Sequence, residues 1–501
     1  MRNILEYLEN TARTTPQNGV TDEGGFCSYP DLLDRSRRAG SGLLPYSASN
    51  RPIPVLMEKG INALTAFLAI VQAGCCYTLL NPDLPDSRLS QVLAVLEPPC
   101  LITDRAHLDR AAALSPAAPV LLLEDLRETA PDPAGLEDRR RPMIDTDPLY
   151  INFTSGSTGV PKGVVIGHRS VLDFIDVFTQ QFSITGADII ANQAPFDFDV
   201  SVKDLYSALK TGAGLVIVPK ALFSQPVGLL DFLCDHRVTT MIWAVSALCL
   251  ITTFHGLDYR VPDTVRKVLF SGEVMPRKHL EAWMAHLPEA EFVNLYGPTE
   301  ITCNCTFHPI DRNRTYEEGI PIGTAFPNER VFLLDGENKL VSEPGRAGEL
   351  CVSGTAVGLG YFRDPVQTAL HFPQNPLNDR FFERIYRTGD LACWNERGEL
   401  RFLGRKDFQI KYKGHRIELE EIEKAMMAQP DVERACCVFD HEKGRLFGFY
   451  LGSVEKKELH KSLSASLPAF MVPGRLVRVE DMPLTKNGKT DRAALMKGCR
   501  T

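Results

Sequence analysis

Apolar runs followed by polar loops are the feature of this sequence that most constrains its fold. Runs such as 52–57, 120–123 and 215–218 alternate with amphipathic stretches of helical period. This alternation is typical of βα units and predicts a largely parallel sheet covered by helices. Ligands of such open sheets bind beyond the carboxyl ends of the strands, so we expect the polar loops to share one site.

Composition and charge narrow the class of protein. The 501 residues leave room for about two to four domains, and the 44% hydrophobic and 24% charged content is ordinary for a globular enzyme. A net charge of -8 argues against nucleic-acid binding. The thirteen cysteines are scattered without a CxxC pair, which favours reduced thiols and a cytoplasmic location.

Segment 63–80 is uncharged and long enough to raise the question of a membrane span. Gly74 interrupts it after a helical run, and 77–80 then resembles a strand, so we expect a buried helix, turn and strand without membrane insertion. Acidic residues within 1–10 favour an amphipathic helix over a signal peptide. Segment 124–142, rich in Pro and charge, is expected to be a solvated connection.

The stretch 150–163, YINFTSGSTGVPKG, combines a strand-like run with a loop of hydroxyls and glycines. Glycines let backbone N–H groups converge, and Lys162 adds positive charge, so the loop suits a polyphosphate. It is not a Walker A loop, because Gly163 follows the lysine where that motif has Ser or Thr. The alternative is a Ser/Gly-rich surface turn.

Asp199 follows an expected strand and begins an expected helix. It could be the counter-ion of a substrate ammonium in an apolar pocket, or an acid that caps the helix. Lys203 lies one helical turn later on the same face, where a surface pair with Asp199 or Asp204 is the simpler interpretation.

Three more clusters contain candidate functional residues, although an ordinary turn would also explain each cluster. In 296–300, YGPTE, an aromatic ring suits a nucleobase and Glu300 suits Mg²⁺ near phosphates. In 386–390, YRTGD, the acid suits two ribose hydroxyls, whereas a hairpin turn is the alternative. The sequence Asn-Gly-Lys at 487–489 is typical of a type I′ hairpin with an exposed lysine.

Taken in order, these pieces resemble the acyl-adenylate-forming (ANL) superfamily of adenylation domains, acyl-CoA synthetases and luciferases. The resemblance extends from Ser28 to the C-terminus and rests on further motifs: GELCVSG (348–354), GYF (360–362), GRKD (404–407), GHRIEL (414–419), LPAFMVP (467–473) and NGKTDR (487–492). Their joint order is far more specific than any one of them.

The resemblance implies an α/β fold with two parts. Residues 1–406 would form a large adenylation core of βα-layered sheets plus a β-barrel-like part, and 407–501 a small α+β subdomain. Asp407 stands at the hinge position about which the small subdomain would pivot after the first step. The pivot would remove Lys489 from the site and bring in the face that carries Gly414.

It also implies ATP and Mg²⁺. Glu300 would hold the metal, Asp390 and Arg405 the ribose, and Asn294 and Tyr296 the adenine. The catalytic residues would be Lys489, Glu300, Thr154 and Lys162. The ATP contacts would be Thr154, Ser155, Gly156, Ser157, Thr158, Gly159, Lys162, Gly272, Glu273, Asn294, Leu295, Tyr296, Gly297, Thr299, Asp390, Arg405 and Lys489. No protein nucleophile is required, in keeping with the absence of a Ser/His/Asp or Cys/His motif.

Asp199 identifies the branch, because amino-acid activators of this superfamily carry an acid there. The segment FDVSVKDLY (198–206) looks most like stand-alone D-alanine–carrier protein ligases, although those have Cys in place of Ser271 and an apolar residue in place of Lys203. The matching pocket positions are Asp199, Val200, Lys203, Trp243, Leu269, Ser271, Leu295, Cys303 and Asn304. Trp243 and Leu295 are expected to limit the pocket to a small side chain.

The leading hypothesis is an alanine- or serine-activating ligase. It would pass the amino acid to the phosphopantetheine of a carrier protein in trans, since no carrier domain follows Arg492. An inward Lys203 must be paired, so an aspartate-like substrate is a variant of this hypothesis. A carboxylate–CoA ligase and a non-catalytic nucleotide-binding relative are the alternatives.

Overall fold

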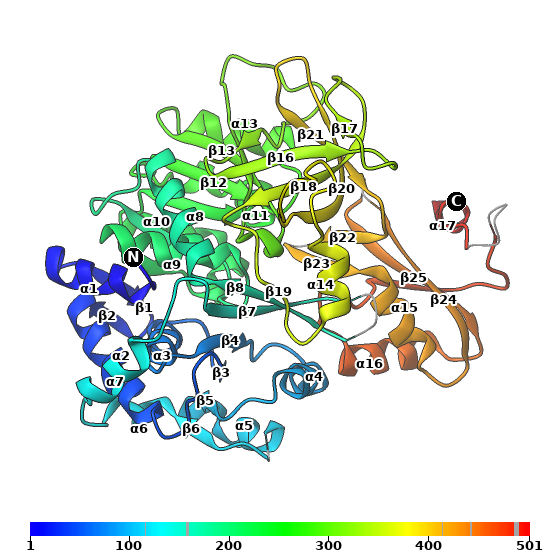
Figure 1. The fold of residues 1–501 in the computed structure, drawn as a ribbon. Coiled ribbons are helices and arrows are strands. Elements are labelled where there is room, and N and C mark those ends of the chain that lie inside the picture. Colours follow the sequence, from blue (N-terminus) through cyan, green and yellow to red (C-terminus); the bar gives the residue numbers. More distant parts are fainter. Residues whose placement is uncertain (116, 157–159, 413, 441–442, 485–489, 501) are drawn as a thin grey trace. The chain divides into compact units, whose positions relative to one another are not determined.

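The computed structural model describes residues 1–115, 117–156, 160–412, 414–440, 443–484 and 490–500 (Figure 1). Its contacts divide the chain into two units. The first unit comprises Met1–Asn81, Pro98–Asn152 and Gly163–Lys406, and the second comprises Pro82–Glu97, Phe153–Lys162 and Asp407–Thr501.

A nine-stranded sheet is the largest element of the first unit. Its order is β15-β14-β13-β12-β11-β9-β10-β1-β2, parallel from β13 to β1 and antiparallel at both edges. Its strands are β1 (Gly19–Asp22), β2 (Gly25–Ser28), β9 (Ile189–Asn192), β10 (Gly214–Ile217), β11 (Thr240–Ala244), β12 (Lys267–Ser271), β13 (Glu291–Tyr296), β14 (Thr306–Pro309) and β15 (Thr324–Ala325). The helices between them are α8 (His168–Gln181), α9 (Val200–Thr211), η2 (Lys220–Ser224), α10 (Pro226–Asp235), α11 (Val245–Thr253), α12 (Gly256–Tyr259), α13 (Arg277–His286) and η3 (Thr299–Ile301).

A seven-stranded sheet of order β19-β8-β7-β4-β3-β5-β6 comes mainly from the first part of the chain. Its strands are β3 (Pro52–Leu56), β4 (Cys76–Leu80), β5 (Leu101–Thr103), β6 (Val120–Leu122), β7 (Pro148–Thr154), β8 (Lys162–Gly167) and β19 (Gly360–Tyr361). The helices from this part of the chain are α1 (Leu5–Thr14), α2 (Tyr29–Leu43), α3 (Ile61–Gln72), η1 (Arg105–His107), α5 (Leu108–Leu114), α6 (Leu123–Arg127) and α7 (Pro133–Arg140).

The expected barrel-like part is a five-stranded antiparallel sheet, β17-β16-β18-β20-β21. It contains β16 (Glu329–Leu334), β17 (Leu340–Val341), β18 (Gly348–Gly354), β20 (Tyr386–Trp394) and β21 (Leu400–Arg405), with α14 (Pro365–His371) between β19 and β20.

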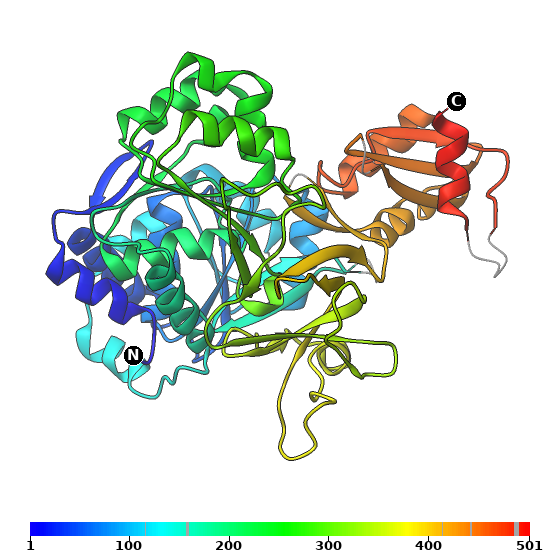
Figure 2. The ribbon, with the colours of Figure 1, turned by 90° about the horizontal axis from the view of Figure 1, so that it is seen from above.

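The second unit is smaller. It contains α4 (Asp86–Leu96), β22 (Gln409–Tyr412), β23 (His415–Glu418), α15 (Leu419–Met427), β24 (Val432–Asp440), β25 (Arg445–Gly452), α16 (Lys456–Ser466), β26 (Arg475–Arg478) and α17 (Arg492–Arg500). Strands β24, β25 and β26 form a sheet on which α15 and α17 pack (Figure 2).

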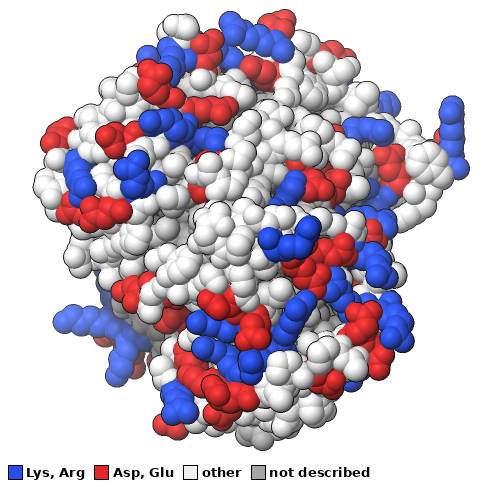
Figure 3. All heavy atoms as spheres, turned by 90° about the vertical axis from the view of Figure 1, so that its left-hand side faces the viewer, with Lys and Arg blue, Asp and Glu red and all other residues white. Residues whose placement is uncertain are grey.

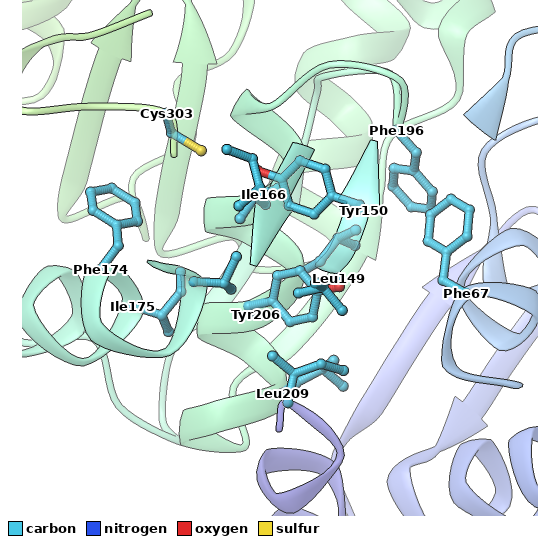
Figure 4. Close-up of a cluster of buried hydrophobic side chains, with 14 of the residues drawn as sticks. Phe67, Leu149, Tyr150, Ile166, Phe174, Ile175, Phe196, Tyr206, Leu209 and Cys303 are labelled. Atoms are coloured by element: carbon cyan, nitrogen blue, oxygen red, sulfur yellow. The ribbon is translucent and has the colours of Figure 1, made fainter. Parts of the chain in front are cut away.

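The main hydrophobic core of the first unit joins helices α3, α8 and α9 to both large sheets (Figure 4). Within this core, the hydroxyl groups of Tyr77 and Tyr206 form a hydrogen bond of 2.7 Å, and the ring of Tyr77 stacks on that of Phe67. Because Leu149 and Tyr150 of β7 and Val202 of α9 belong to this core, packing fixes the strand and the helix that lead to expected site residues.

Segment 63–80 is α3, a turn at Gly74 with φ 76°, and β4, so the predicted helix, turn and strand are confirmed. No helix of the described residues has the length and apolar content of a membrane span. The connection expected over 124–142 is largely solvent-exposed, but it also contains α6 and α7, which bury Leu126 and Leu136. On the face in Figure 3, positive and negative side chains lie interspersed.

Candidate active site

The start of α9 carries the first residues of the site. Asp199 occupies the N-cap position, but its side chain accepts no capping hydrogen bond, so capping does not account for this carboxylate. Its backbone oxygen accepts the thiol of Cys303 at 2.8 Å. Burial raises the pKa of Cys303 well above the usual range, which keeps the thiol protonated as a donor. Val200 follows as the first, half-buried residue of the helix.

A tight turn after β13 brings Cys303 to α9. Thr302 and Cys303 have φ angles of 53° and 80°, a left-handed conformation that is unusual outside glycine. A Cβ on Gly297 would lie 2.4 Å from Cα of Asn304, so only glycine fits this close approach. The turn therefore presents Cys303 and Asn304 on the same side as the start of α9.

Lys203 is fully buried on α9. Its Nζ donates to Oδ1 of Asn304 at 2.7 Å and lies 3.5 Å from Oγ of Ser271. The interpretation of Lys203 as a surface charge is wrong, because its ammonium points at two other predicted pocket residues. Three elements, α9, the end of β12 and the 302–305 turn, thus converge on one amine.

A second polar group lies beside Lys203 and was not singled out as a site from the sequence. Asp204 is fully buried, and its Oδ2 accepts Nδ2 of Asn192 at 2.7 Å. Lys59 donates to Oδ1 of Asn192 at 3.2 Å and to the backbone of Gln193 at 2.9 Å. Burial raises the pKa of Asp204 and lowers that of Lys59 to about 8. The sequence signal that could have identified this group is the adjacent pair of charged residues, Lys203 and Asp204, within a mostly apolar helix.

Leu269, Ser271 and Leu295 share one face of the nine-stranded sheet, but Trp243 does not. The register pairs Trp243 with Phe270, and alternation then turns Trp243 away from Leu269. Its indole Nε1 donates to the Ala191 carbonyl at 2.8 Å, inside a separate hydrophobic cluster. The structure therefore does not bring Trp243 to the other pocket residues.

The expected nucleotide-binding residues of the first unit form a connected group. The hydroxyl of Tyr296 donates to Asp390, and Arg405 lies 2.5 Å from the same carboxylate across the β20–β21 pair. Asp390 belongs to a continuous strand, so the hairpin-turn interpretation is wrong. Asn294 donates its amide to the Pro321 carbonyl at 2.8 Å, which fixes the side chain.

Other expected contacts follow strand ends. Gly272 has φ 99° directly after β12, and Glu273 comes next. Gly297 precedes η3, the short helix that begins at Thr299 and carries Glu300.

Glu300 is buried on η3 and accepts the hydroxyl of Tyr361 at 2.8 Å. Tyr361 was quoted in the GYF motif but not expected in the site. No group of three His, Cys, Asp or Glu side chains suited to a metal occurs in the part of the chain that the structure describes. One carboxylate fits the way proteins hold Mg²⁺ together with substrate phosphates, so Glu300 is compatible with that role.

The hydroxyl-rich loop belongs to the second unit. Thr154 ends β7, Ser155 and Gly156 follow, and Lys162 begins β8. Ser157, Thr158, Gly159 and Lys489 lie outside the described residues. Asp407 accepts the backbone N–H of Gln409 at 3.2 Å.

Comparison with known proteins gives a family. The family model described as AMP-binding enzyme matches residues 8–362, and the model described as AMP-binding enzyme C-terminal domain matches 421–489. An L-proline–[L-prolyl-carrier protein] ligase of Streptomyces coelicolor is 34% identical over 469 residues, covering 88% of this chain and 86% of that protein. Surfactin synthase subunit 1 of Bacillus subtilis is 30% identical over 99% of this chain, which spans only 14% of that much longer protein.

Solved structures agree. Holo-PA1221, a protein with adenylation and PCP domains bound to a vinylsulfonamide inhibitor, matches with a TM-score of 0.84 at 26% identity over 99% of this chain and 84% of that one. The Vibrio cholerae adenylation domain AlmE, in complex with glycyl-adenosine-5'-phosphate, matches in fold with a TM-score of 0.86 at 22% identity, covering 99% and 97%. The expected α/β fold with a large N-terminal and a smaller C-terminal domain is confirmed.

Proposed function

The chain belongs to the AMP-binding enzyme family, and from that premise we propose that it is an amino acid–carrier protein ligase. It uses ATP to form an aminoacyl-AMP and transfers the amino acid to the phosphopantetheine thiol of a carrier protein acting in trans. The observation that carries the proposal is Asp199, a carboxylate at the start of α9 that is not used as a helix cap. An α-ammonium group is the ligand that such a position suits.

The first step needs charge stabilisation. The substrate carboxylate attacks the α-phosphorus and pyrophosphate leaves, so negative charge crowds one centre. Lys162 and Lys489 supply positive charge there, and the backbone N–H groups after Thr154 supply donors. Mg²⁺ bound at Glu300 would add Lewis-acid stabilisation when present.

The nucleoside is held by the connected group of the first unit. Asp390 accepts the ribose hydroxyls while Arg405 fixes its carboxylate, and Tyr296 offers its ring to adenine. Because Tyr296 and Arg405 already orient Asp390, little rearrangement is needed on binding.

We place the domain boundary at 406/407. Residues 407–501 pivot about Asp407, which exchanges Lys489 for the face of Gly414 between the two steps. The longest segment of the second unit, Asp407–Thr501, begins at this boundary.

A small amino acid, alanine- or serine-like, is the first candidate substrate, because Ser271 and Cys303 offer polar contacts of short reach and the buried Leu295 limits the space. The burial of Lys203 favours a second candidate. Its ammonium donates to Asn304 beside Ser271. A carboxylate oxygen of an aspartate-like side chain could therefore replace one of these two oxygens as the acceptor of Lys203.

Pyrophosphate exchange into ATP, measured with all D- and L-amino acids and common carboxylic acids, tests the function. We expect exchange with one or a few amino acids, and transfer to a phosphopantetheinyl carrier. Exchange only with acids that lack an ammonium, CoA-dependent AMP release and full activity of Asp199→Ala would instead establish the CoA ligase. No exchange with any acid would contradict catalysis altogether.

The role of Lys489 is tested separately for each step. Lys489→Ala should abolish adenylate formation while transfer from supplied aminoacyl-AMP continues, whereas the exposed Lys497→Ala should affect neither. Equal loss of both steps would contradict the assigned role.

A further inference from the structure

Three segments of the second unit meet at one carboxylate. Glu421 of α15 is 4% exposed, and its Oε1 accepts Nη1 of Arg88 from α4 at 2.6 Å. Its Oε2 accepts the backbone N–H of Gly156 at 3.2 Å. The neighbouring Ser155 donates its hydroxyl to the carbonyl of Arg416 at 2.9 Å. Ser155 and Gly156, the two residues directly after β7, are therefore held by the segment that begins at Asp407.

The Gly156 contact matters because of what this N–H is expected to do. Under the proposed function it is one of the backbone donors for the ATP phosphates. A single N–H directed at a carboxylate cannot give a full hydrogen bond to a phosphate oxygen at the same time. A carboxylate and a phosphate oxygen are both anionic acceptors, so Glu421 meets the same requirement that a phosphate would meet.

Local geometry makes this N–H hard to redirect. A Cβ on Gly156 would lie 2.1 Å from the Val160 carbonyl oxygen, so the backbone turns back on itself here. Arg88 in turn fixes Glu421, since both side chains are buried. Burial raises the pKa of Glu421, and the guanidinium of Arg88 opposes that shift and favours the charged form.

We infer that Glu421 is a positioning residue that alternates with ATP for the N–H of Gly156. With Glu421 on the loop, residues 155–156 are tied to α15 and closed to a phosphate; ATP binds when Glu421 leaves. The inference rests on the proposed function and adds a residue that makes nucleotide binding and the position of α15 mutually exclusive. Because the two contacts are coupled, any interaction that favours the contact of α15 with the loop weakens ATP binding, and bound ATP weakens that contact by the same factor.

The test is the affinity for ATP, measured by calorimetry, together with the KM for ATP in pyrophosphate exchange. Glu421→Gln keeps the shape but replaces a charged acceptor by a weaker neutral one. We expect about a five- to tenfold lower dissociation constant and KM for ATP, with kcat within about twofold.

A matched control lies on the same helix. Glu423 is half-buried, and it accepts the backbone N–H of Cys437 in β24 at 2.7 Å and Nη2 of Arg492 in α17 at 2.7 Å. Glu423→Gln should leave the affinity for ATP unchanged. A merely structural ion pair would move neither ATP constant in either variant.

A second variant, the double change Arg88→Met with Glu421→Met, keeps the test valid if Glu421→Gln alone fails to fold. Replacing both partners of a buried ion pair by apolar side chains is generally tolerated. It should reproduce the gain in ATP affinity. Unchanged or weaker ATP affinity in both Glu421 variants would overturn the inference. Failure of the proposed function looks different: ATP binds, but no acid supports exchange.

Discussion

The two units each bury a cation, and the two cations are held differently. In the first unit, Lys203 donates to the amide oxygen of Asn304 and lies near the hydroxyl of Ser271. In the second, Arg88 donates to the carboxylate of Glu421. The first cation contacts neutral oxygens of two separate elements at the expected pocket and also lies beside the carboxyl group of Asp204. The second is a buried ion pair between two helices.

The two arrangements suit different tasks. Removing one partner of a buried ion pair leaves an uncompensated charge, at about 3–5 kcal/mol, so such a pair fixes elements in place. A hydrogen bond from a cation to a neutral oxygen contributes about 1.5–3 kcal/mol and can be exchanged for a similar oxygen of a ligand. The Arg88 pair is therefore suited to positioning, and the Lys203 group to selection.

The largest effect is expected from breaking the ion pair on one side. Arg88→Met should lower the free energy of unfolding of the second unit by about 3–5 kcal/mol, because Glu421 stays buried with its cation gone. Denaturant unfolding measures this. Arg105→Met is the control, since its ion pair with Asp125 at 3.9 Å is mostly exposed and should contribute little. If Arg88→Met unfolds like the control, the pair does not fix α4 to α15.

Substrate selection provides the next contrast. Lys203→Met should lower kcat/KM for an amino acid with an acceptor side chain by about 10- to 100-fold, while an alanine-sized substrate loses much less. Pyrophosphate exchange with both classes measures the ratio. Lys210→Met is the control on the same helix, because that lysine pairs with Asp176 near the surface. An equal loss for both classes would make Lys203 a structural residue.

Much of the fold followed from patterns that are local in sequence. The strands β3 and β10 lie where apolar runs predicted them, since burial on a parallel sheet requires such runs. The strand-end clusters were also visible, and Asp199, Lys203, Ser271 and Asn304 do converge.

What could not be predicted depends on long-range packing. Helical spacing shows that Lys203 shares a face with Asp199, but not whether that face is buried. Strand alternation separates Trp243 from Leu269 only once the register is known. Arg88 and Glu421 are 333 residues apart, and neither belongs to a pattern that names its partner.

The smallest effect concerns the acid next to Lys203. Asp204 faces Lys203, Lys59 and Asn192, and burial raises its pKa above the ordinary value near 4. The native state then binds more protons than the unfolded state between that value and the raised pKa. Stability should therefore fall as the pH rises through this window, by at most about 1.4 kcal/mol per pH unit.

Asp204→Asn removes the titrating group and should flatten this slope, which unfolding at pH 5 and pH 7 measures directly. Asp176→Asn, at the exposed end of the Lys210 pair, should leave the slope in place. A slope unchanged in Asp204→Asn would mean that Lys203 and Lys59 keep this carboxylate ionised throughout. Lys203 would then, like Arg88, face an ionised carboxylate, and the contrast between the two buried cations would become smaller.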